Sequence, residues 1–207
     1  MNSKKIDDYF DNVSTTYQSK TKKFPWSFLR NLELNAIKKV IPNVQDKNIV
    51  EYGCGAGFYT NFLYSKNPSS IIAVDSVLKM INQLPQNKIN TVNTDCIDHL
   101  QELNTNNINT HTHIIFAAGL LEFITSPSIF LKLSHRAIED NGSLVLLVPQ
   151  KSILSRFYSN FHKKNGIHIS ILSSTEWLKL FKETGWVVYK EKAILSFSKA
   201  ICLRKKS

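Results

Sequence analysis

Glycine and cysteine are both scarce in this chain. It holds seven glycines in 207 residues, and three of them fall between positions 53 and 57. Its three cysteines, Cys54, Cys96 and Cys202, are odd in number and widely spaced, without a C-x-x-C pair. This pattern argues against a disulfide framework and against a zinc site, so we expect reduced thiols and no metal.

Long apolar runs are also missing. No stretch approaches the ~18 apolar residues that a membrane-spanning helix needs. The start of the chain, MNSKKIDD, lacks the apolar core of a secretory signal. We therefore expect a cytoplasmic protein. Since 43% of the residues are hydrophobic and the length suits one unit, we expect residues 1–207 to form a single domain.

Acidic residues are fewer than basic ones, 16 against 26, which gives a formal net charge of +10. Such an excess of positive charge can favour binding to nucleic acid, to an anionic membrane surface or to an acidic substrate. The basic residues are spread along the chain and are densest in residues 20–30 and 151–164. Neither segment resembles an RNA-binding motif, so nucleic acid is not expected as a partner. Peripheral membrane contact by the later segment stays open, and so does the oligomeric state.

The clustered glycines follow a strand-like run and precede a helix-like one. Residues 48–50 are apolar enough to end a buried strand, and residues 58–64 carry apolar side chains at helical spacing. Free backbone N–H groups at such a turn can hold a carboxylate or a phosphate. A dinucleotide fingerprint would need a small residue where this chain has Phe58. The spacing from Glu51 to Gly57 is instead E-x-G-x-G-x-G.

This acid–glycine pattern resembles the first motif of the class I S-adenosylmethionine-dependent methyltransferases of the small-molecule type. The resemblance implies that S-adenosyl-L-methionine is the cofactor and that the loop binds its methionine part. Glu51 would meet the ammonium group, directly or through water. The remaining loop residues that the resemblance assigns to the cofactor are Gly53, Cys54, Gly55 and Gly57.

Two aspartates at later strand ends fit the same resemblance. Asp75 lies about 20 residues beyond the glycine loop, where an acceptor-only carboxylate can take both ribose hydroxyls, and Ser76 stands beside it. Asp95 would accept from the adenine amino group, with the backbone N–H of Cys96 at the ring. Each aspartate can also be interpreted as a helix cap. The predicted cofactor site also includes Ala117 and, from an opening segment resembling F-D-x-x-A-x-x-Y, Tyr17, which can equally be a packing residue.

Strand-like and helix-like segments alternate through the chain. This predicts an α/β fold with a Rossmann-like, seven-stranded, mostly parallel sheet, an antiparallel last strand and helices on both faces. Two helices in residues 1–42 would form an N-terminal helical arm, and residues 150–170 would form a substrate lid. The predicted strands end at residues 51, 75, 93, 118 and 149, and the last two span 186–189 and 193–203. The predicted helices after the arm span 58–66, 76–84, 97–103, 126–138, 151–164 and 174–183.

The chemistry implied by the family is an in-line displacement on an activated methyl group, driven mainly by proximity and orientation. Many relatives carry a histidine in an L-E-H stretch after the fourth strand, where this chain has Phe123, which cannot act as a base. The catalytic residue is therefore unknown. The candidate substrate-binding residues are Leu121, Glu122, Phe123, Phe157, Tyr158 and His162. Glu122 could orient a substrate amine, and an aromatic pocket, if arm and lid meet, suggests an apolar or aromatic small molecule, with Phe24, Trp26 and Phe161 as further members.

Two alternatives remain open. The basic surface could serve an RNA or protein methyltransferase, although residues 117–120, AAGL, lack the N/D-P-P-Y/F tetrad of base-modifying relatives. A non-catalytic binding subunit could keep the cofactor fold as a scaffold, because a fold alone does not establish a function.

Overall fold

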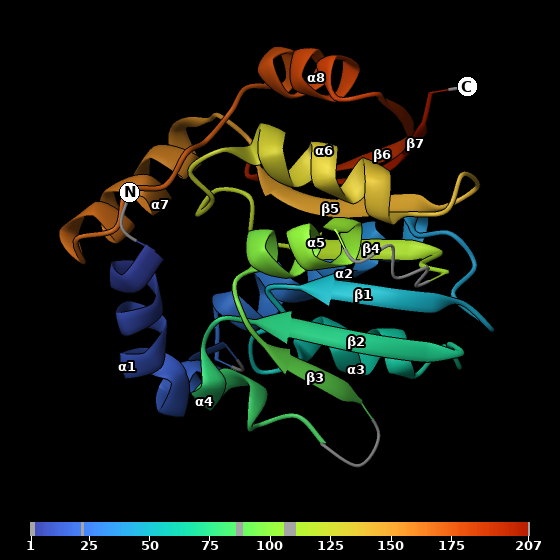
Figure 1. Cartoon of the computed structure of the whole chain (residues 1–207). Helices are drawn as coiled ribbons and strands as arrows, with labels where there is room; N and C mark the ends of the chain where they lie inside the picture. Colours follow the sequence, from blue (N-terminus) through green and yellow to red (C-terminus); the bar gives the residue numbers. More distant parts are fainter. Residues whose placement is uncertain (1–2, 22, 86–88, 106–110, 207) are drawn as a thin grey trace.

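Seven strands form one mixed sheet in the computed structural model, which describes residues 3–21, 23–85, 89–105 and 111–206 (Figure 1). Across the sheet the strands follow the order β3-β2-β1-β4-β5-β7-β6. Their bounds are β1 Asn48–Tyr52, β2 Ser70–Asp75, β3 Asn90–Asn93, β4 Ile114–Ala118, β5 Ser143–Pro149, β6 Trp186–Ile194 and β7 Ser198–Lys205. The first five strands pair in parallel, whereas β7 runs antiparallel to both β5 and β6. The predicted Rossmann-like architecture is confirmed.

Helices cover both faces of the sheet, because the buried strands are apolar on both sides. One core cluster joins the strands to α2 (Trp26–Val40) and α3 (Phe58–Tyr64). The opposite cluster joins them to α5 (Cys96–Thr105), α6 (Pro127–Ala137) and α8 (Ser174–Glu183). These two layers hold the strand ends in fixed positions, which is what a site at one edge of the sheet requires.

Two further helices stand beyond the carboxyl ends of the strands. Figure 1 shows α1 (Ser3–Thr21) and α7 (Ile153–Lys164) on the side to which the arrowheads of β1 and β2 point. Within the predicted arm, α1 is therefore set apart from the sheet, while α2 packs on it through Ala36, Ile37 and Val40. The segment predicted as a lid, residues 150–170, contains α7. No helix in the described ranges is long and apolar enough to cross a membrane.

Several predicted boundaries were wrong. The last strand was expected over residues 193–203, but β7 spans Ser198–Lys205. The helix expected over residues 76–84 is reduced to α4, Leu78–Ile81. The sixth strand extends to Ile194 instead of ending at Tyr189, and its register shifts between Val188 and Lys190. Because β6 is an edge strand, its charged residues can face solvent while its backbone still pairs with β7.

Candidate active site

The turn between β1 and α3 is built from glycines in left-handed conformations. The φ angles of Gly53, Gly55 and Gly57 are 67°, 52° and 83°. Residues other than glycine adopt such values only with strain. The backbone N–H of Gly53 donates to the carbonyl of Val74 at 2.9 Å, which ties the turn to the neighbouring strand. A Cβ atom built on Gly55 would meet no protein atom within 4 Å. The turn therefore presents bare backbone to open space.

Asp75, the last residue of β2, faces this turn. One carboxylate oxygen accepts the N–H of Gly55 at 2.8 Å and the other accepts the N–H of Val77 at 2.9 Å. Burial raises the pKa of Asp75, although both backbone hydrogen bonds oppose that shift. Each oxygen keeps a second lone pair, so the carboxylate can still accept two ligand hydroxyls. Ser76 beside it is exposed and donates to Asp7 of α1 at 2.6 Å.

Asp95 combines the two interpretations that the sequence allowed. Its carboxylate accepts the N–H of Ile97 at 2.7 Å, which caps the start of α5. Asp95 and the buried Cys96 also line the same cavity as Asp75. A capping role and a ligand-facing position therefore coexist in one residue.

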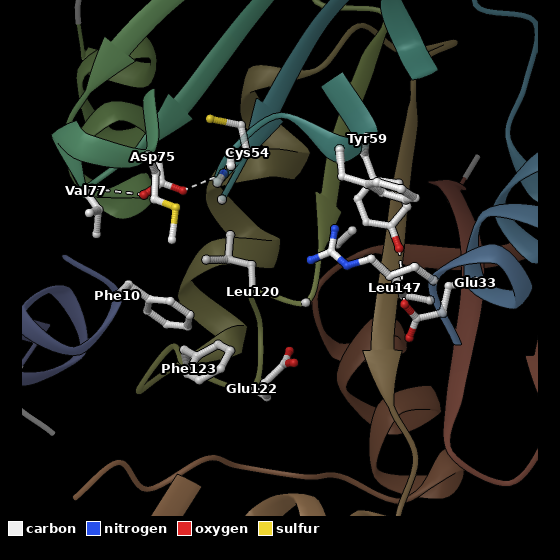
Figure 2. Close-up of a pocket in the computed structure, with 18 of the residues that line it drawn as sticks. Phe10, Glu33, Cys54, Tyr59, Asp75, Val77, Leu120, Glu122, Phe123 and Leu147 are labelled. Carbon is white, nitrogen blue, oxygen red and sulfur yellow. Dashed lines mark hydrogen bonds between the residues drawn. The ribbon is translucent and has the colours of Figure 1, made fainter. Parts of the chain in front are cut away.

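A cavity of about 730 Å³ connects the glycine turn with α1, α2 and α7. Its walls contain much of the predicted site, which comes from residues at the ends of several strands (Figure 2) and from α7. The predicted residues that line it are Gly53, Cys54, Gly55, Asp75, Ser76, Asp95, Cys96, Glu122, Phe123, Tyr158 and His162, with Trp26 and Phe161 from the aromatic set.

Several predicted residues do not line this cavity. Ala117 and Leu121 are fully buried in the core, and their neighbours Ala118 and Leu120 face the cavity in their place. Successive side chains of a strand point to opposite faces, so a one-residue error reverses the assignment for Ala117. Three more predicted residues are not among those that line the cavity: Gly57 precedes α3 in the turn, and Phe157 and Phe24 face solvent. The side chain of Tyr17 lies outside the described part of the structure.

Glu51 lies below the turn and not in the cavity wall. It is 2% exposed, and its Oε2 atom has no hydrogen-bond partner within the described ranges. Burial raises the pKa of Glu51 to about 8. The nearby Thr60 hydroxyl lowers this pKa in part, although it does not form a hydrogen bond of good geometry with the carboxyl. A buried carboxyl with an unpaired oxygen is costly. A cationic ligand group reaching the turn would relieve that cost.

Aromatic rings line the cavity where α1 and α7 approach the turn after β4. Phe10 of α1 meets Phe123 edge-on at 5.3 Å between ring centroids. His162 of α7 lies among Tyr9, Phe123 and Tyr158, with centroid distances between 4.6 and 6.0 Å. Burial lowers the pKa of His162 to about 4, so its imidazole is neutral at pH 7. This wall is apolar and suits a flat or apolar ligand.

Of the α2 residues that line the cavity, sequence reasoning named Trp26 but missed Glu33. Glu33 lines the cavity and accepts the hydroxyls of Tyr59 and Ser198, both at 3.3 Å. Burial raises its pKa to about 6, with Arg30 acting in the opposite direction. One signal was available: Glu33 is the sole acidic residue in the sequence of α2, placed between Leu32 and Leu34.

Comparison with known proteins agrees with this geometry. The model of a family described as "Methyltransferase domain" matches residues 26–191. The chain belongs to this methyltransferase family. The expectation of a class I S-adenosylmethionine-dependent enzyme is thereby confirmed, and S-adenosyl-L-methionine is the cofactor of that class.

Solved structures show the same fold for this methyltransferase at low sequence identity. Magnesium protoporphyrin IX methyltransferase from Synechocystis PCC 6803, with bound S-adenosylhomocysteine, is 12% identical with a TM-score of 0.76, covering 100% of both chains. A 1,6-didemethyltoxoflavin N1-methyltransferase from Burkholderia thailandensis is 11% identical with a TM-score of 0.74, covering 99% of this chain and 89% of its own. An S-adenosylmethionine-dependent methyltransferase from Archaeoglobus fulgidus is 16% identical with a TM-score of 0.69, covering 91% and 99%. No curated protein sequence is significantly similar to the chain.

Proposed function

We propose that this methyltransferase transfers a methyl group from S-adenosyl-L-methionine to a small molecule. The observation that carries the proposal is the continuous cavity of about 730 Å³ that runs from the glycine turn to the aromatic wall beside α1 and α7. Cavities of this size and apolar character are typical of small-molecule sites. The two relatives with named substrates, magnesium protoporphyrin IX and 1,6-didemethyltoxoflavin, also act on small molecules.

The residues at the turn fit the three parts of the cofactor. The open space above Gly55 accommodates the amino-acid part, and the unpaired oxygen of Glu51 below it suits the ammonium group. Asp75 can accept the ribose hydroxyls with the lone pairs that Gly55 and Val77 leave free. Asp95 and the backbone of Cys96 would hold the adenine. Tyr17 stays a further candidate of the arm.

The bound cofactor supplies a methyl group on a positively charged sulfur, so the leaving group is already activated. What remains for the protein is to place a nucleophile in line with the methyl carbon, which can contribute several kcal/mol. The aromatic wall of Phe10, Phe123 and Tyr158 would orient the acceptor and exclude water. Phe123 has no proton-accepting group, so any base must come from elsewhere in the cavity.

Two measurements test this proposal. Calorimetric titration with S-adenosylmethionine and S-adenosylhomocysteine should show binding of both, and absence of binding would favour a non-catalytic scaffold. Labelled methyl groups should then enter the small-metabolite fraction of a cell extract and not its RNA or protein fractions. Label confined to RNA or protein would reject the small-molecule assignment and favour a macromolecular substrate for the basic surface.

A further inference from the structure

Two carboxyl groups lie in the part of the cavity away from the predicted cofactor contacts. Figure 2 shows Glu33 and Glu122 on that side, with Asp75 at the other end of the pocket. Glu33 comes from α2, and Glu122 comes from the turn that follows β4. They are 89 positions apart in sequence, yet they are close enough for the charge of Glu33 to raise the pKa of Glu122. The fold therefore brings together two acids that no sequence motif links.

Glu122 is the more enclosed of the two. It is 4% exposed, lines the cavity, and its Oε2 atom has no hydrogen-bond partner in the described part of the chain. The hydroxyl of Tyr158 on α7 interacts with this carboxyl, and its Oε1 atom lies 3.8 Å from the position of a Cβ atom built on Gly119. An unpaired buried oxygen of this kind is a costly arrangement that a ligand donor would relieve.

The groups that face the two carboxyls balance them only in part. Arg30 is the one lysine or arginine among the described residues that line the cavity, and it acts on Glu33. Tyr59 and Ser198 donate neutral hydroxyls to Glu33. His162 is the remaining titratable group on α7 at this side, and its ring is packed among aromatic rings. This end of the cavity thus presents more acceptors than its own donors satisfy.

We propose that Glu33 and Glu122 bind a basic nitrogen of the methyl acceptor, so that this enzyme is an N-methyltransferase for an amine. The inference rests on the proposed function and names its substrate class. Glu122 is neutral in the free protein at pH 7, whereas Glu33 is ionised near Arg30, so a carboxylate or phosphate ligand would be repelled by Glu33. A neutral hydroxyl could hydrogen-bond to Glu122, but unlike a cation it would not stabilise the ionised form of that carboxyl.

The two carboxyls have different roles in the transfer. Burial raises the pKa of Glu122 to about 8 and that of Glu33 to about 6, so Glu122 holds a proton more strongly. An incoming ammonium group releases the proton of Glu122 to solvent, because a cation stabilises the ionised carboxylate. Glu122 then takes one proton from the nitrogen, which frees its lone pair. As the nitrogen–carbon bond forms, the carbon–sulfur bond breaks, the electron pair stays on sulfur, and the methylated ammonium product pairs with the carboxylate of Glu33.

Conservative variants test this without disturbing the fold. Glu122 is protonated at pH 7, so Glu122→Gln has nearly the same shape and charge in the free protein. In Glu33→Gln the amide oxygen can still accept from Tyr59 or Ser198. Glu102→Gln on the exposed side of α5 is the matched control. Unchanged binding of S-adenosylhomocysteine in all three would show that the cofactor site is intact, so a failure of this inference is distinguishable from a failure of the proposed function.

The probes are aryl-alkyl amines and heteroaromatic amines, each with its matched alcohol and carboxylate, added to the protein saturated with S-adenosylhomocysteine. We expect amines alone to raise the melting temperature, and Glu122→Gln and Glu33→Gln each to weaken amine binding by about tenfold or more. Calorimetry at pH 7 in two buffers of different ionisation enthalpy should show proton release on amine binding in the parent and none in Glu122→Gln.

Three outcomes would overturn the inference. Alcohols or carboxylates could bind as well as the amines do, or no amine could bind at all. Glu122→Gln could also bind amines with the affinity and proton release of the parent. A parent protein that does not bind S-adenosylhomocysteine would refute the proposed function itself. That measurement needs neither the variants nor the amines.

Discussion

The carboxylate of Asp75 accepts the backbone N–H of Gly55 at 2.8 Å and so joins the end of β2 to the glycine turn that follows β1. Two contacts proposed for the cofactor, one to its amino-acid part and one to its ribose, are therefore held by a single hydrogen bond. Disturbing either residue should alter both. This coupling gives the first prediction.

Asp75→Ala should weaken S-adenosylhomocysteine binding by about 10- to 100-fold, since hydrogen bonds to a charged group contribute roughly 1.5–3 kcal/mol. Isothermal titration calorimetry measures the change. Asp98→Ala, which removes an exposed carboxylate on α5, is the control, and His162→Ala should also cost much less. Equal losses in Asp75→Ala and in the controls would mean that the ribose lies elsewhere.

Glu51→Gln should change both the pH dependence of the free energy of unfolding and the affinity for the cofactor. The pKa of Glu51 is about 8 in the folded protein against 4.5 as its ordinary value, so folding above pH 4.5 takes up a proton. The stability that Glu51 contributes is thus complete below pH 4.5 and is lost as pH rises to about 8. By linkage the loss at pH 8 is on the order of 4 kcal/mol.

Without this titration, the free energy of unfolding of Glu51→Gln should fall less between pH 5 and pH 8 than that of the parent, as measured by urea denaturation. Its affinity for S-adenosylmethionine should drop by about tenfold or more, because the ammonium partner is lost. An unchanged pH slope would show that the carboxyl of Glu51 is already ionised in the folded protein.

Two glycine substitutions should give opposite patterns. An alanine at Gly57 would place its Cβ 2.5 Å from the Cδ2 atom of Leu84, in addition to the strain of a φ of +83°. We expect Gly57→Ala to lose about 1–3 kcal/mol of unfolding free energy. Gly55→Ala meets no protein atom within 4 Å, so it should lose about 1–2 kcal/mol from backbone strain alone, while its methyl group enters the cofactor space.

Thermal denaturation and calorimetry of the two alanine variants provide the comparison. Cofactor affinity should fall in Gly55→Ala by about tenfold, comparable with the loss of one good contact, and stay close to the parent value in Gly57→Ala. Should both variants bind the cofactor equally well, the space above Gly55 is not where the amino-acid part lies.

The outer face of α7 should bind anionic membranes. Ile153, Phe157 and Phe161 are 74%, 68% and 51% exposed and follow one another at four-residue spacing. Arg156, Lys163 and Lys164 are exposed on the same helix, whose sequence has no acidic residue. An amphipathic helix of this composition binds at the interface of a membrane with negative lipids.

Vesicle co-sedimentation should show binding to phosphatidylserine-containing vesicles and little to phosphatidylcholine alone. Phe157→Ser should reduce that binding several-fold, roughly as expected from removing one interfacial aromatic side chain, and Leu178→Ser, at an exposed apolar position of α8, should not. Binding that ignores lipid charge, or that survives Phe157→Ser, would contradict this prediction.

The cofactor half of the site was accessible from sequence because each of its parts is local. The glycine spacing, Asp75 and Asp95 all lie where a strand ends, and a parallel sheet gathers such ends at one edge. The face of the sheet to which each residue of a strand points could not be predicted in the same way. β4 is apolar on both faces, so its composition does not reveal which of Ala117 and Ala118 faces the cavity.

The acceptor half was predicted only in part: Glu122, Phe123, Tyr158 and His162 line the cavity as expected, but Glu33 was not among the candidates. Glu33 reaches the cavity because α2 packs beside β7, where Ser198 is 165 positions away. Such a contact depends on tertiary packing and leaves no periodic or spacing signal. The short α4 has a local origin instead: the carboxylate of Asp75 accepts the N–H of Val77, Val77 is extended, and the helix begins only at Leu78.

The reversed direction of β7 has a consequence for how this enzyme can diversify. Its first residue, Ser198, pairs with Pro149 where β5 ends. The hairpin between β6 and β7 therefore reaches the cavity beside Glu33, away from the residues proposed to bind the ribose and adenine. Substitutions in that hairpin would change the residues beside the acceptor end of the cavity and leave β1, β2 and β3 untouched. A descendant could thus acquire a new methyl acceptor and inherit its cofactor chemistry intact.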